Sequence, residues 1–315
     1  MAENLMHALQ YNSYGGGAAA LKHVEVPIPT PNKGEILLKL EAISLNPADW
    51  KIQKGMLHPL LPRKFPFIPA SDVAGDVVKV GPGVTNYKVG DKVVSLLHHF
   101  TGGGLAEYAV AKENLTVARP PEIPVAEAAG LPMAGLTAHQ AVTHRAGVKL
   151  DGSGQQLNLL ITAASGGIGH YAVQLAKLGN THVTALVGLV IWILSKASEQ
   201  TSPSGRKYDV VIHCASGITW STFEPNLSSN GKVIDITPGL SAFLTCAMKK
   251  LTFSKKKMVP LQLSPKKENL DYLVNLVKDG KLKTVIDSKY PLSKAEEAWA
   301  KSIDGHATGK IIVEP

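Results

Sequence analysis

Cysteine is almost absent from this chain of 315 residues, in which Cys214 and Cys246 are the only two. Two thiols cannot supply a disulfide framework, a structural zinc site of four thiolates or an iron–sulfur cluster. Long apolar runs are missing too, since residues 183–194 fall short of the ~20 residues that a transmembrane helix needs. The first residues, MAENLMH, resemble neither a signal peptide nor a transit peptide. We therefore expect a globular protein of a reducing compartment, without a cleavable targeting segment.

Acidic residues are fewer than basic ones, 25 Asp and Glu against 33 Lys and Arg, which gives a formal charge of +8. The lysines gather at positions 249–250, 255–257 and 266–267. No helix-turn-helix, zinc-finger or aromatic RNA-binding motif accompanies them, which disfavours nucleic acid as a partner. An anionic membrane surface, a polyphosphate cofactor and a solvated lysine-rich face remain open.

The hydrophobic pattern divides the chain into a β-rich part and an alternating part. Short strand-like runs punctuated by glycine turns fill residues 34–45, 73–94 and 105–111 and predict a small barrel. After residue 125, helical segments at 125–129, 136–146 and 168–178 occur among strands at 157–162, 182–185, 209–214 and 232–237. This alternation predicts a parallel, doubly wound sheet. We expect one domain over residues 1–124, with 280–315 returning to it, and a second over 125–279.

A glycine-rich turn, residues 163–169 (AASGGIG), lies between a predicted strand and a predicted helix. It matches the dinucleotide-binding fingerprint with alanine in place of the first glycine. Gly166 would let the backbone approach a pyrophosphate, and Gly169 would let helix and strand pack closely. The N–H groups at the start of the helix would face the anion. The turn therefore predicts a dinucleotide site that includes Ser165.

Several separate motifs then occur in the order typical of one family. They are residues 44–51 (SLNPADWK), 69–75 (PASDVAG), 80–81 (VG) with 89–93 (VGDKV), the glycine turn, and 307–313 (ATGKIIV). With them the chain resembles the zinc-independent, quinone oxidoreductase-like members of the medium-chain dehydrogenase/reductase superfamily, most closely those of the plant chloroplast envelope. The resemblance covers nearly the whole chain apart from about residues 186–207.

This resemblance implies an α/β fold, with a GroES-like β-barrel catalytic domain packed against a Rossmann domain and the active site in the cleft between them. It implies hydride transfer from NADPH to a quinone or to the activated C=C bond of an enone or alkenal. It also implies peripheral attachment to the inner chloroplast envelope, with the cytosol as the alternative, and a homodimer as a possible assembly.

The residues favour a metal-free form of this chemistry. Zinc-dependent relatives have a cysteine in place of Asn46 and a His-Glu pair in place of Ser71-Asp72. An amide and a hydroxyl are poor zinc ligands, so we expect no catalytic metal. Without a Lewis acid, the substrate must itself be electrophilic, and the protein must orient it and stabilise the developing oxyanion.

Motif by motif, the resemblance implies roles for individual residues. Lys51 would contact cofactor or substrate, and Asn46 and Asp49 would shape the nicotinamide end, although Asp49 could simply hold its loop and Lys51 could be an ordinary surface lysine. Gly167 and Ile168 would touch the pyrophosphate, and Thr137 would lie beside the nicotinamide. The remaining cofactor positions would be Ile236, Gly305 and His306. His98, His99 and Phe100 could line the substrate pocket. His213 and Cys214 are expected to pack in the core or at the cofactor's edge.

The pattern breaks after the strand at 182–185. Neither an acidic nor a basic residue stands where a dinucleotide domain usually selects between NADH and NADPH. Residues 186–207 number only 22, whereas a helix, a strand and their connections need roughly 24–34 residues. Two interpretations are open: a deletion that removes the 2′-phosphate site, or a shortened crossover that still binds NADPH. The competing functions are a non-catalytic relative that binds a membrane or partner through its lysines, an alcohol dehydrogenase and, more weakly, an RNA-binding protein.

Overall fold

The computed structural model describes residues 4–56, 58–59, 62–98, 101–187, 205–215 and 217–315. The chain forms two compact units. Unit 1 contains residues 1–136 and 265–315, and unit 2 contains residues 137–264. Residues 125–136 and 265–279 therefore belong to unit 1. The sequence predicts both segments in the second domain, with boundaries after residues 124 and 279.

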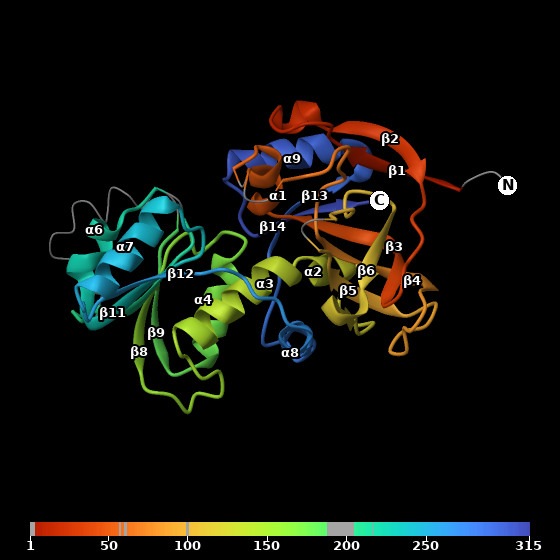
Figure 1. Ribbon diagram of the computed structural model, residues 1–315. Helices are drawn as coiled ribbons and strands as arrows, with labels where there is room; N and C mark the ends of the chain where they lie inside the picture. Colours follow the sequence, from red (N-terminus) through yellow and green to blue (C-terminus); the bar gives the residue numbers. More distant parts are fainter. Residues whose placement is uncertain (1–3, 57, 60–61, 99–100, 188–204, 216) are drawn as a thin grey trace. The chain divides into compact units, whose positions relative to one another are not determined.

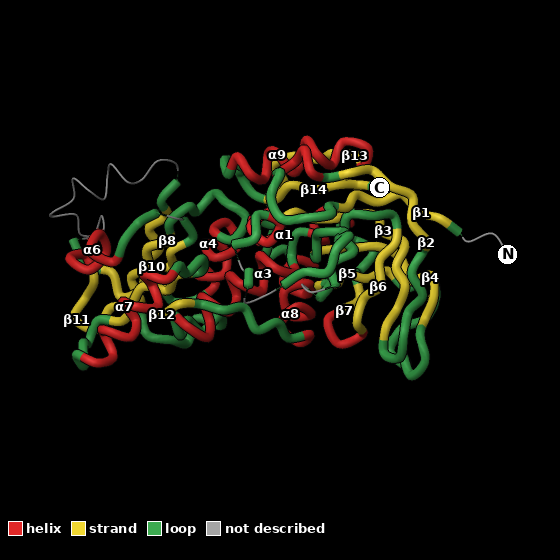
Figure 2. Tube along the Cα trace, turned by 45° about the horizontal axis from the view of Figure 1, so that its top comes forward, coloured by secondary structure: helices red, strands yellow, loops and turns green. Residues whose placement is uncertain are grey.

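Unit 1 is built on a seven-stranded sheet in which β6 pairs with β3 beside the main strand path β13-β14-β3-β4-β5-β7. A separate two-stranded sheet holds β1 (Leu5–Gln10) and β2 (Lys22–Pro27). Figures 1 and 2 show these strands in one part of the molecule. The strands of the larger sheet are β3 (Glu35–Leu45), β4 (Asp72–Val80), β5 (Lys92–Leu96), β6 (Tyr108–Lys112), β7 (Thr116–Ala118), β13 (Ile286–Pro291) and β14 (Lys310–Glu314).

The C-terminal strand pairs with a strand of the N-terminal part of the chain. Strand β14 pairs antiparallel with the last residues of β3, Ile311 opposite Leu45 and Val313 opposite Ile43. Their apolar side chains are buried in the unit's core together with Trp299. This pairing brings the first residue of β14, Lys310, to the point where β3 ends and the next helix begins.

The helices of unit 1 cover its sheet and link its ends. Trp299 of α9 donates from its indole Nε1 to Gln53 Oε1 of α1 at 2.9 Å, which ties these two helices together. The helices are α1 (Pro47–Gln53), α2 (Val125–Ala129), α8 (Lys267–Lys278) and α9 (Ala295–Asp304). A further helix, α3 (Pro132–His139), runs across the boundary into unit 2.

Unit 2 contains a parallel sheet in the order β12-β11-β10-β8-β9. The chain runs from β8 to β9 on one side and then to β10 on the other side of β8, as a doubly wound sheet requires, so the predicted fold class is confirmed. The strands are β8 (Leu157–Ile161), β9 (Thr181–Ala185), β10 (Tyr208–His213), β11 (Leu227–Asp235) and β12 (Lys257–Pro260). The helices are α4 (Gly169–Leu178), α6 (Trp220–Phe223) and α7 (Leu240–Leu251).

Two segments differ from the sequence-based expectation. The helix expected over residues 136–146 is α3, which ends at His139, followed by a π-helical stretch, Gln140–Arg145. Strand β11 begins at Leu227, five residues before the predicted start, because its first half is polar and hides the strand pattern. The predicted shortfall over residues 186–207 falls largely on residues 188–204, which lie outside the described ranges.

Candidate active site

The glycine turn connects β8 to α4 through a tight bend. Ala163 has a left-handed backbone with φ of 47°, and the Gly166 N–H donates to the Ala163 carbonyl at 3.0 Å. A Cβ at Gly169 would lie 2.2 Å from that same carbonyl oxygen. Only glycine therefore lets α4 start so close to the end of β8, which is the packing role that the fingerprint gives its last glycine.

The backbone N–H groups in the first turn of α4 have no side-chain cap, so they can donate to a hydrogen-bond acceptor such as a phosphate oxygen. The N-cap residue of α4, Ile168, has no side-chain oxygen and makes no capping hydrogen bond. His170 Nδ1 lies 2.9 Å from the Gly166 carbonyl oxygen, a contact that steadies the turn from the helix side. An uncapped helix N-terminus behind a glycine turn presents N–H groups and a positive dipole end, which suits a phosphate.

The neighbouring strand ends carry polar groups that bond to one another. Thr162 Oγ1, directly after β8, lies 3.0 Å from His213 Nδ1 at the end of β10 and accepts a hydrogen bond from the Cys214 N–H. Burial lowers the pKa of His213 to about 4 and raises that of Cys214 to about 12. At neutral pH both side chains are therefore uncharged and suited to packing, as expected, rather than to proton transfer.

In unit 1, the motif SLNPADWK folds into a capped helix. Asn46 ends the extended segment after β3 and is the N-cap of α1, with Pro47 in the first turn. Asn46 and Asp49 form a capping box, in which the Asn46 N–H donates to Asp49 Oδ2 at 2.8 Å. Asn46 and Asp49 are thus brought together, and Asp49 holds the loop that orients α1.

A buried ammonium completes this arrangement. Lys310, 2% exposed, donates from Nζ to Asn46 Oδ1 at 2.5 Å and to the Leu45 carbonyl at 3.3 Å. The Asn46 amide nitrogen in turn donates to Asp72 Oδ2 at 2.9 Å. Asp72 also accepts the Met133 N–H near the start of α3, at 3.1 Å. One lysine, one asparagine and two carboxyl groups therefore form a buried network that joins β3, β4, β14, α1 and α3.

The carboxyl groups of this network hold their protons more tightly than usual. Burial raises the pKa of Asp49 to about 7, against the lowering effect of the Asn46 N–H. Burial likewise raises the pKa of Asp72 to about 6, against the lowering effects of Lys310 and Asn46. The pKa of Lys310 is lowered by burial, while the two carboxylates act in the opposite direction. Near neutral pH the network can therefore gain or lose a proton.

Lys51 lies in the last turn of α1, half-buried, with its ammonium 5.7 Å from the centroid of the Trp50 ring. Because the capping box fixes the start of this short helix, it also fixes the direction of Lys51.

The other predicted site residues lie in several places. Thr137 is buried in α3, and the Ile236 N–H donates to the His213 carbonyl at 3.2 Å, beside the strand ends described above. Gly305 follows α9 with φ of 79°, and the exposed His306 pairs with Asp304 at 3.0 Å. His98 follows β5, and burial lowers its pKa. His99 and Phe100 lie outside the described residues.

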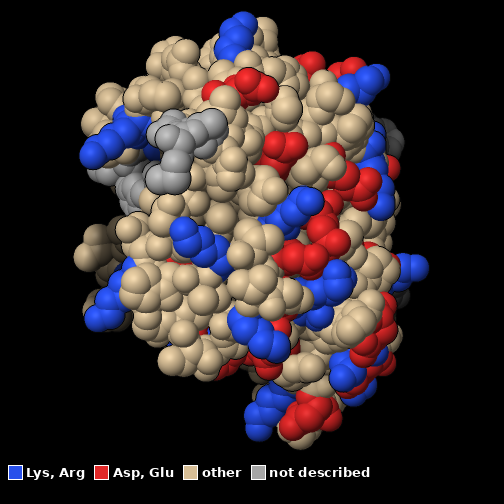
Figure 3. Space-filling view, turned by 90° about the vertical axis from the view of Figure 1, so that its right-hand side faces the viewer, with Lys and Arg blue, Asp and Glu red and all other residues tan. Residues whose placement is uncertain are grey.

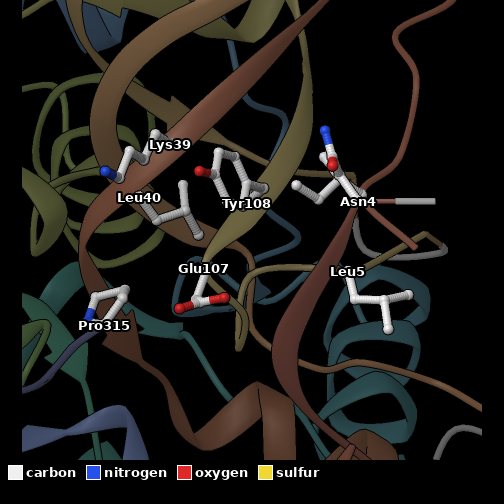
Figure 4. Close-up of a pocket in the computed structure, with 8 residues that line it drawn as sticks. Asn4, Leu5, Lys39, Leu40, Glu107, Tyr108 and Pro315 are labelled. Atoms are coloured by element: carbon white, nitrogen blue, oxygen red, sulfur yellow. The ribbon is translucent and has the colours of Figure 1, made fainter. Parts of the chain in front are cut away.

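Two hollows lie in unit 1. One of about 10 Å³ borders Asp49 and Ser71, which is room for a single water and not for a substrate. The other, about 680 Å³, includes none of the predicted site residues. Figure 4 shows Lys39 and Glu107 on its walls, so it carries both signs of charge and favours no single class of ligand.

Comparison with known proteins gives the family. Residues 32–122 match the family described as "Alcohol dehydrogenase GroES-like domain", and residues 190–313 match "Zinc-binding dehydrogenase". The chain is 67% identical, over all of both chains, to the "Chloroplast envelope quinone oxidoreductase homolog" of Arabidopsis thaliana. The chain belongs to the quinone oxidoreductases of the medium-chain dehydrogenase/reductase superfamily. Proteins of this family use a nicotinamide cofactor.

More distant relatives support the same family and fold. The "NADPH-dependent alkenal/one oxidoreductase, chloroplastic" of Arabidopsis thaliana is 30% identical, over 98% of this chain and 80% of its own length. The solved quinone oxidoreductase of Coxiella burnetii is 28% identical, with a TM-score of 0.86 over 99% of this chain and 100% of its own. The medium-chain fold, a GroES-like domain and a Rossmann-type domain with five parallel strands, is thereby established.

The alignment with the envelope relative also bears on the shortened crossover. It runs over 329 positions, whereas this chain has 315 residues, so at least 14 aligned positions have no residue in this chain. This deficit of at least 14 residues exceeds the roughly 2–12 residues by which residues 186–207 fall short of the expected 24–34.

The zinc in one family description does not suit this quinone oxidoreductase. The positions concerned hold an amide, a hydroxyl and a carboxyl group, in Asn46, Ser71 and Asp72, instead of the thiolate and imidazole that zinc prefers. Moreover, the Lys310 ammonium already donates to Asn46 Oδ1, and a metal ion there would face a positive charge. The residues at these positions do not fit a catalytic zinc.

Sequence reasoning missed two members of the network, Lys310 and Asp72. A signal was present for Lys310, which directly precedes the apolar run Ile311–Val313 in a motif that closes the chain. A charged residue at the start of a buried strand needs a partner. The partner could not be named, because Asn46 is 264 positions away.

Proposed function

We propose that this protein is an NADPH-dependent reductase that transfers a hydride to a quinone or to the activated C=C bond of an enone or alkenal. The observation that carries the proposal is the turn at residues 163–169, which leads into the uncapped start of α4. Family membership supports the oxidoreductase chemistry. The printed name of the alkenal/one relative supports NADPH and a conjugated carbonyl substrate.

The chemistry of unit 1 favours an electrophilic substrate. An amide, a hydroxyl and a carboxyl group stand where zinc-dependent relatives have metal ligands, and a buried ammonium is bonded to the amide. Polarisation of an unreactive alcohol or carbonyl by a metal is therefore not available from these residues. Quinones and conjugated carbonyls accept a hydride without polarisation by a metal. The same comparison counts against an alcohol dehydrogenase.

In this proposal the nicotinamide supplies the hydride, and the chain's own residues bind, orient and exclude water. The N–H groups of Gly167, Ile168 and Gly169 bind the pyrophosphate, and Ser165 adds a hydroxyl. Lys51 supplies a positive charge to a phosphate or to the oxygen that becomes negative during reduction. Both polar groups of the Asn46 side chain are bonded within unit 1, so we propose that it positions α1 and does not touch the substrate.

The affinity for NADPH depends on which residues bind its 2′-phosphate. The last two residues of β9 and the two that follow it, 184–187 (Thr-Ala-Leu-Val), include no charged side chain for the 2′-phosphate. If the missing residues removed the charged partners of this phosphate, NADPH would bind much more weakly and without preference over NADH. Micromolar binding with a strong preference for NADPH would contradict that loss.

The test is a titration with NADPH and NADH, followed by oxidation of NADPH with a quinone and with a short-chain enone. We expect both acceptors or one of them to be reduced, and Gly169→Val to abolish binding. Gly239→Ala is the matched control, because a Cβ there meets no atom within 4 Å. A folded protein that binds neither nucleotide would refute the reductase proposal.

A second candidate is a non-catalytic relative that binds a membrane through its lysines. The basic excess of the chain and the envelope location in the name of the 67% identical relative favour membrane attachment in either case. We therefore propose a peripheral protein of the inner chloroplast envelope. No helix in the described part of the chain has the length and apolarity to cross a bilayer.

A further inference from the structure

Helix α7 of unit 2, labelled in Figure 1, carries large apolar side chains that are exposed to solvent. Residues three, four, eight and eleven positions after Leu240 fall on the same side of the helix. This side, the α7 stripe, is exposed along its length: Leu240 76%, Phe243 55%, Leu244 62%, Met248 52% and Leu251 80%. The opposite side, which packs on the core of unit 2, offers only the small Ala242 and Cys246. Folding of the chain alone therefore leaves the apolar face of α7 without a partner in the described structure.

The residue after the C-cap of α7 strengthens this observation. Phe253 is 93% exposed and has φ of 50°, a left-handed conformation that is unusual for a bulky side chain. Its N–H donates to the Lys250 carbonyl at 3.2 Å, in the turn that closes the helix. Glycine usually occupies such a position. A strained and almost fully exposed aromatic residue beside an apolar stripe points to a role outside the folded monomer.

The segment that carries the stripe has basic residues and no acidic ones. Residues 236–264 contain five lysines and no Asp, Glu or Arg, against a formal charge of +8 for the whole chain. Lys249 is paired with Glu224 at 2.7 Å, while Lys250, Lys255 and Lys257 are exposed. Lys257 also lies opposite Lys232 in the pairing of β12 with β11. By contrast, basic and acidic side chains are interspersed on the face shown in Figure 3. In unit 1, Lys92 pairs with Asp76 at 3.2 Å.

We propose that α7 lies in the headgroup region of an anionic membrane, with the α7 stripe and Phe253 inserted and the exposed lysines on the lipid phosphates. An amphipathic helix with Leu and Phe on one side and lysines beside it is suited to this position. A two-fold contact between copies through the same stripe would bring both sets of lysines together, so the charge favours a lipid surface. The inference deepens the proposed envelope attachment and does not depend on reductase activity.

The experiment is co-sedimentation of the full-length protein with vesicles of phosphatidylcholine, alone or mixed with phosphatidylglycerol. Two variants test the two parts of the surface: Leu244→Ser/Leu251→Ser for the stripe, and Lys250→Gln/Lys255→Gln/Lys257→Gln for the charges. Val89→Ser/Lys79→Gln on unit 1 is the matched control, since both of these residues are exposed. The oligomeric state of each protein is measured by sedimentation velocity, and its folding by circular dichroism.

We expect binding to the phosphatidylglycerol vesicles and little to the neutral ones, with a loss of about tenfold or more in each α7 variant and none in the control. Absence of wild-type binding would overturn both the envelope attachment and the role of α7. Equal binding by Leu244→Ser/Leu251→Ser would leave attachment intact and overturn the role of the stripe. A wild-type dimer that this variant converts to a monomer, without a change in vesicle binding, would assign the stripe to a contact between copies.

Discussion

Replacing Lys310 by methionine tests the buried network directly, because the effect must depend on pH. The Lys310 ammonium donates to Asn46, and the charges of both Asp49 and Asp72 act on it. Methionine fills a similar volume without charge. The loss in the free energy of unfolding that Lys310→Met causes therefore depends on whether the two carboxyl groups are ionised.

The magnitude follows from the raised pKa values. At pH 5 both carboxyl groups are mostly protonated, since the pKa of Asp49 is about 7 and that of Asp72 about 6. Loss of the hydrogen bonds of Lys310 then costs only about 1 kcal/mol, offset by removal of a buried charge. At pH 8 the carboxylates would lose their cation, and removal of one partner of a buried pair costs roughly 3–5 kcal/mol. The variant should therefore lose stability as the pH rises through the range 6–7.

The assay is denaturant unfolding of unit 1 at both pH values, followed by the fluorescence of Trp50 and Trp299. Trp192 and Trp220 are replaced by phenylalanine in every protein, so that these two report alone. Lys310→Arg, which keeps the charge, should retain most of the stability at pH 8. Lys310→Met/Asp72→Asn should recover part of the loss. An equal loss for Lys310→Met at pH 5 and pH 8 would refute the assignment of Lys310 as the counter-charge.

Three further predictions concern single residues. The folded pKa of Asp49 is raised from 3.8 to about 7, so its contribution to stability is present below pH 4 and is lost as the pH rises through 7, by roughly 4 kcal/mol. Asp49→Asn should flatten that part of the pH profile of unfolding, and an unchanged profile would contradict the pKa shift. Gly169→Ala should destabilise unit 2 by about 2 kcal/mol or more, because its Cβ would meet the Ala163 carbonyl oxygen at 2.2 Å. Thermal unfolding beside Gly239→Ala would show it, and equal melting temperatures would argue against the close packing. Lys51→Met should weaken NADPH binding about tenfold in a fluorescence titration, whereas Lys54→Met, on the exposed Lys54, should not. Equal affinities would remove Lys51 from the site.

Local patterns made much of unit 2 predictable. An apolar strand, a glycine turn and a helix of period 3.6 follow one another within 22 residues, and the structure has them as β8 and α4 within a residue or so of the expected bounds. The return of β14 to the first sheet was also predicted, although its partner strand was not named. These features depend on neighbours in the sequence, where hydrophobic periodicity is informative.

The buried network could not be predicted in the same way. Asn46 was expected at the site from a motif, but its partners Asp72 and Lys310 lie 26 and 264 positions away. Only the pairing of β3 with β4 and β14 brings them together. No helix was predicted over the residues of α7, and an apolar stripe like that of α7 would ordinarily predict a buried face. In this helix the small side chains of Ala242 and Cys246 face the core, and the large ones face outward.

The central claim, that this quinone oxidoreductase homologue binds NADPH at the glycine turn and reduces a conjugated acceptor, is tested most directly by single-turnover oxidation of bound NADPH. The full chain is mixed with NADPH and then with a quinone or a short-chain enone, and the absorbance of the reduced nicotinamide is followed. We expect a decay of this absorbance that requires both protein and acceptor and is absent in Gly169→Val. A folded wild-type protein that leaves NADPH unchanged with every acceptor would contradict the central claim.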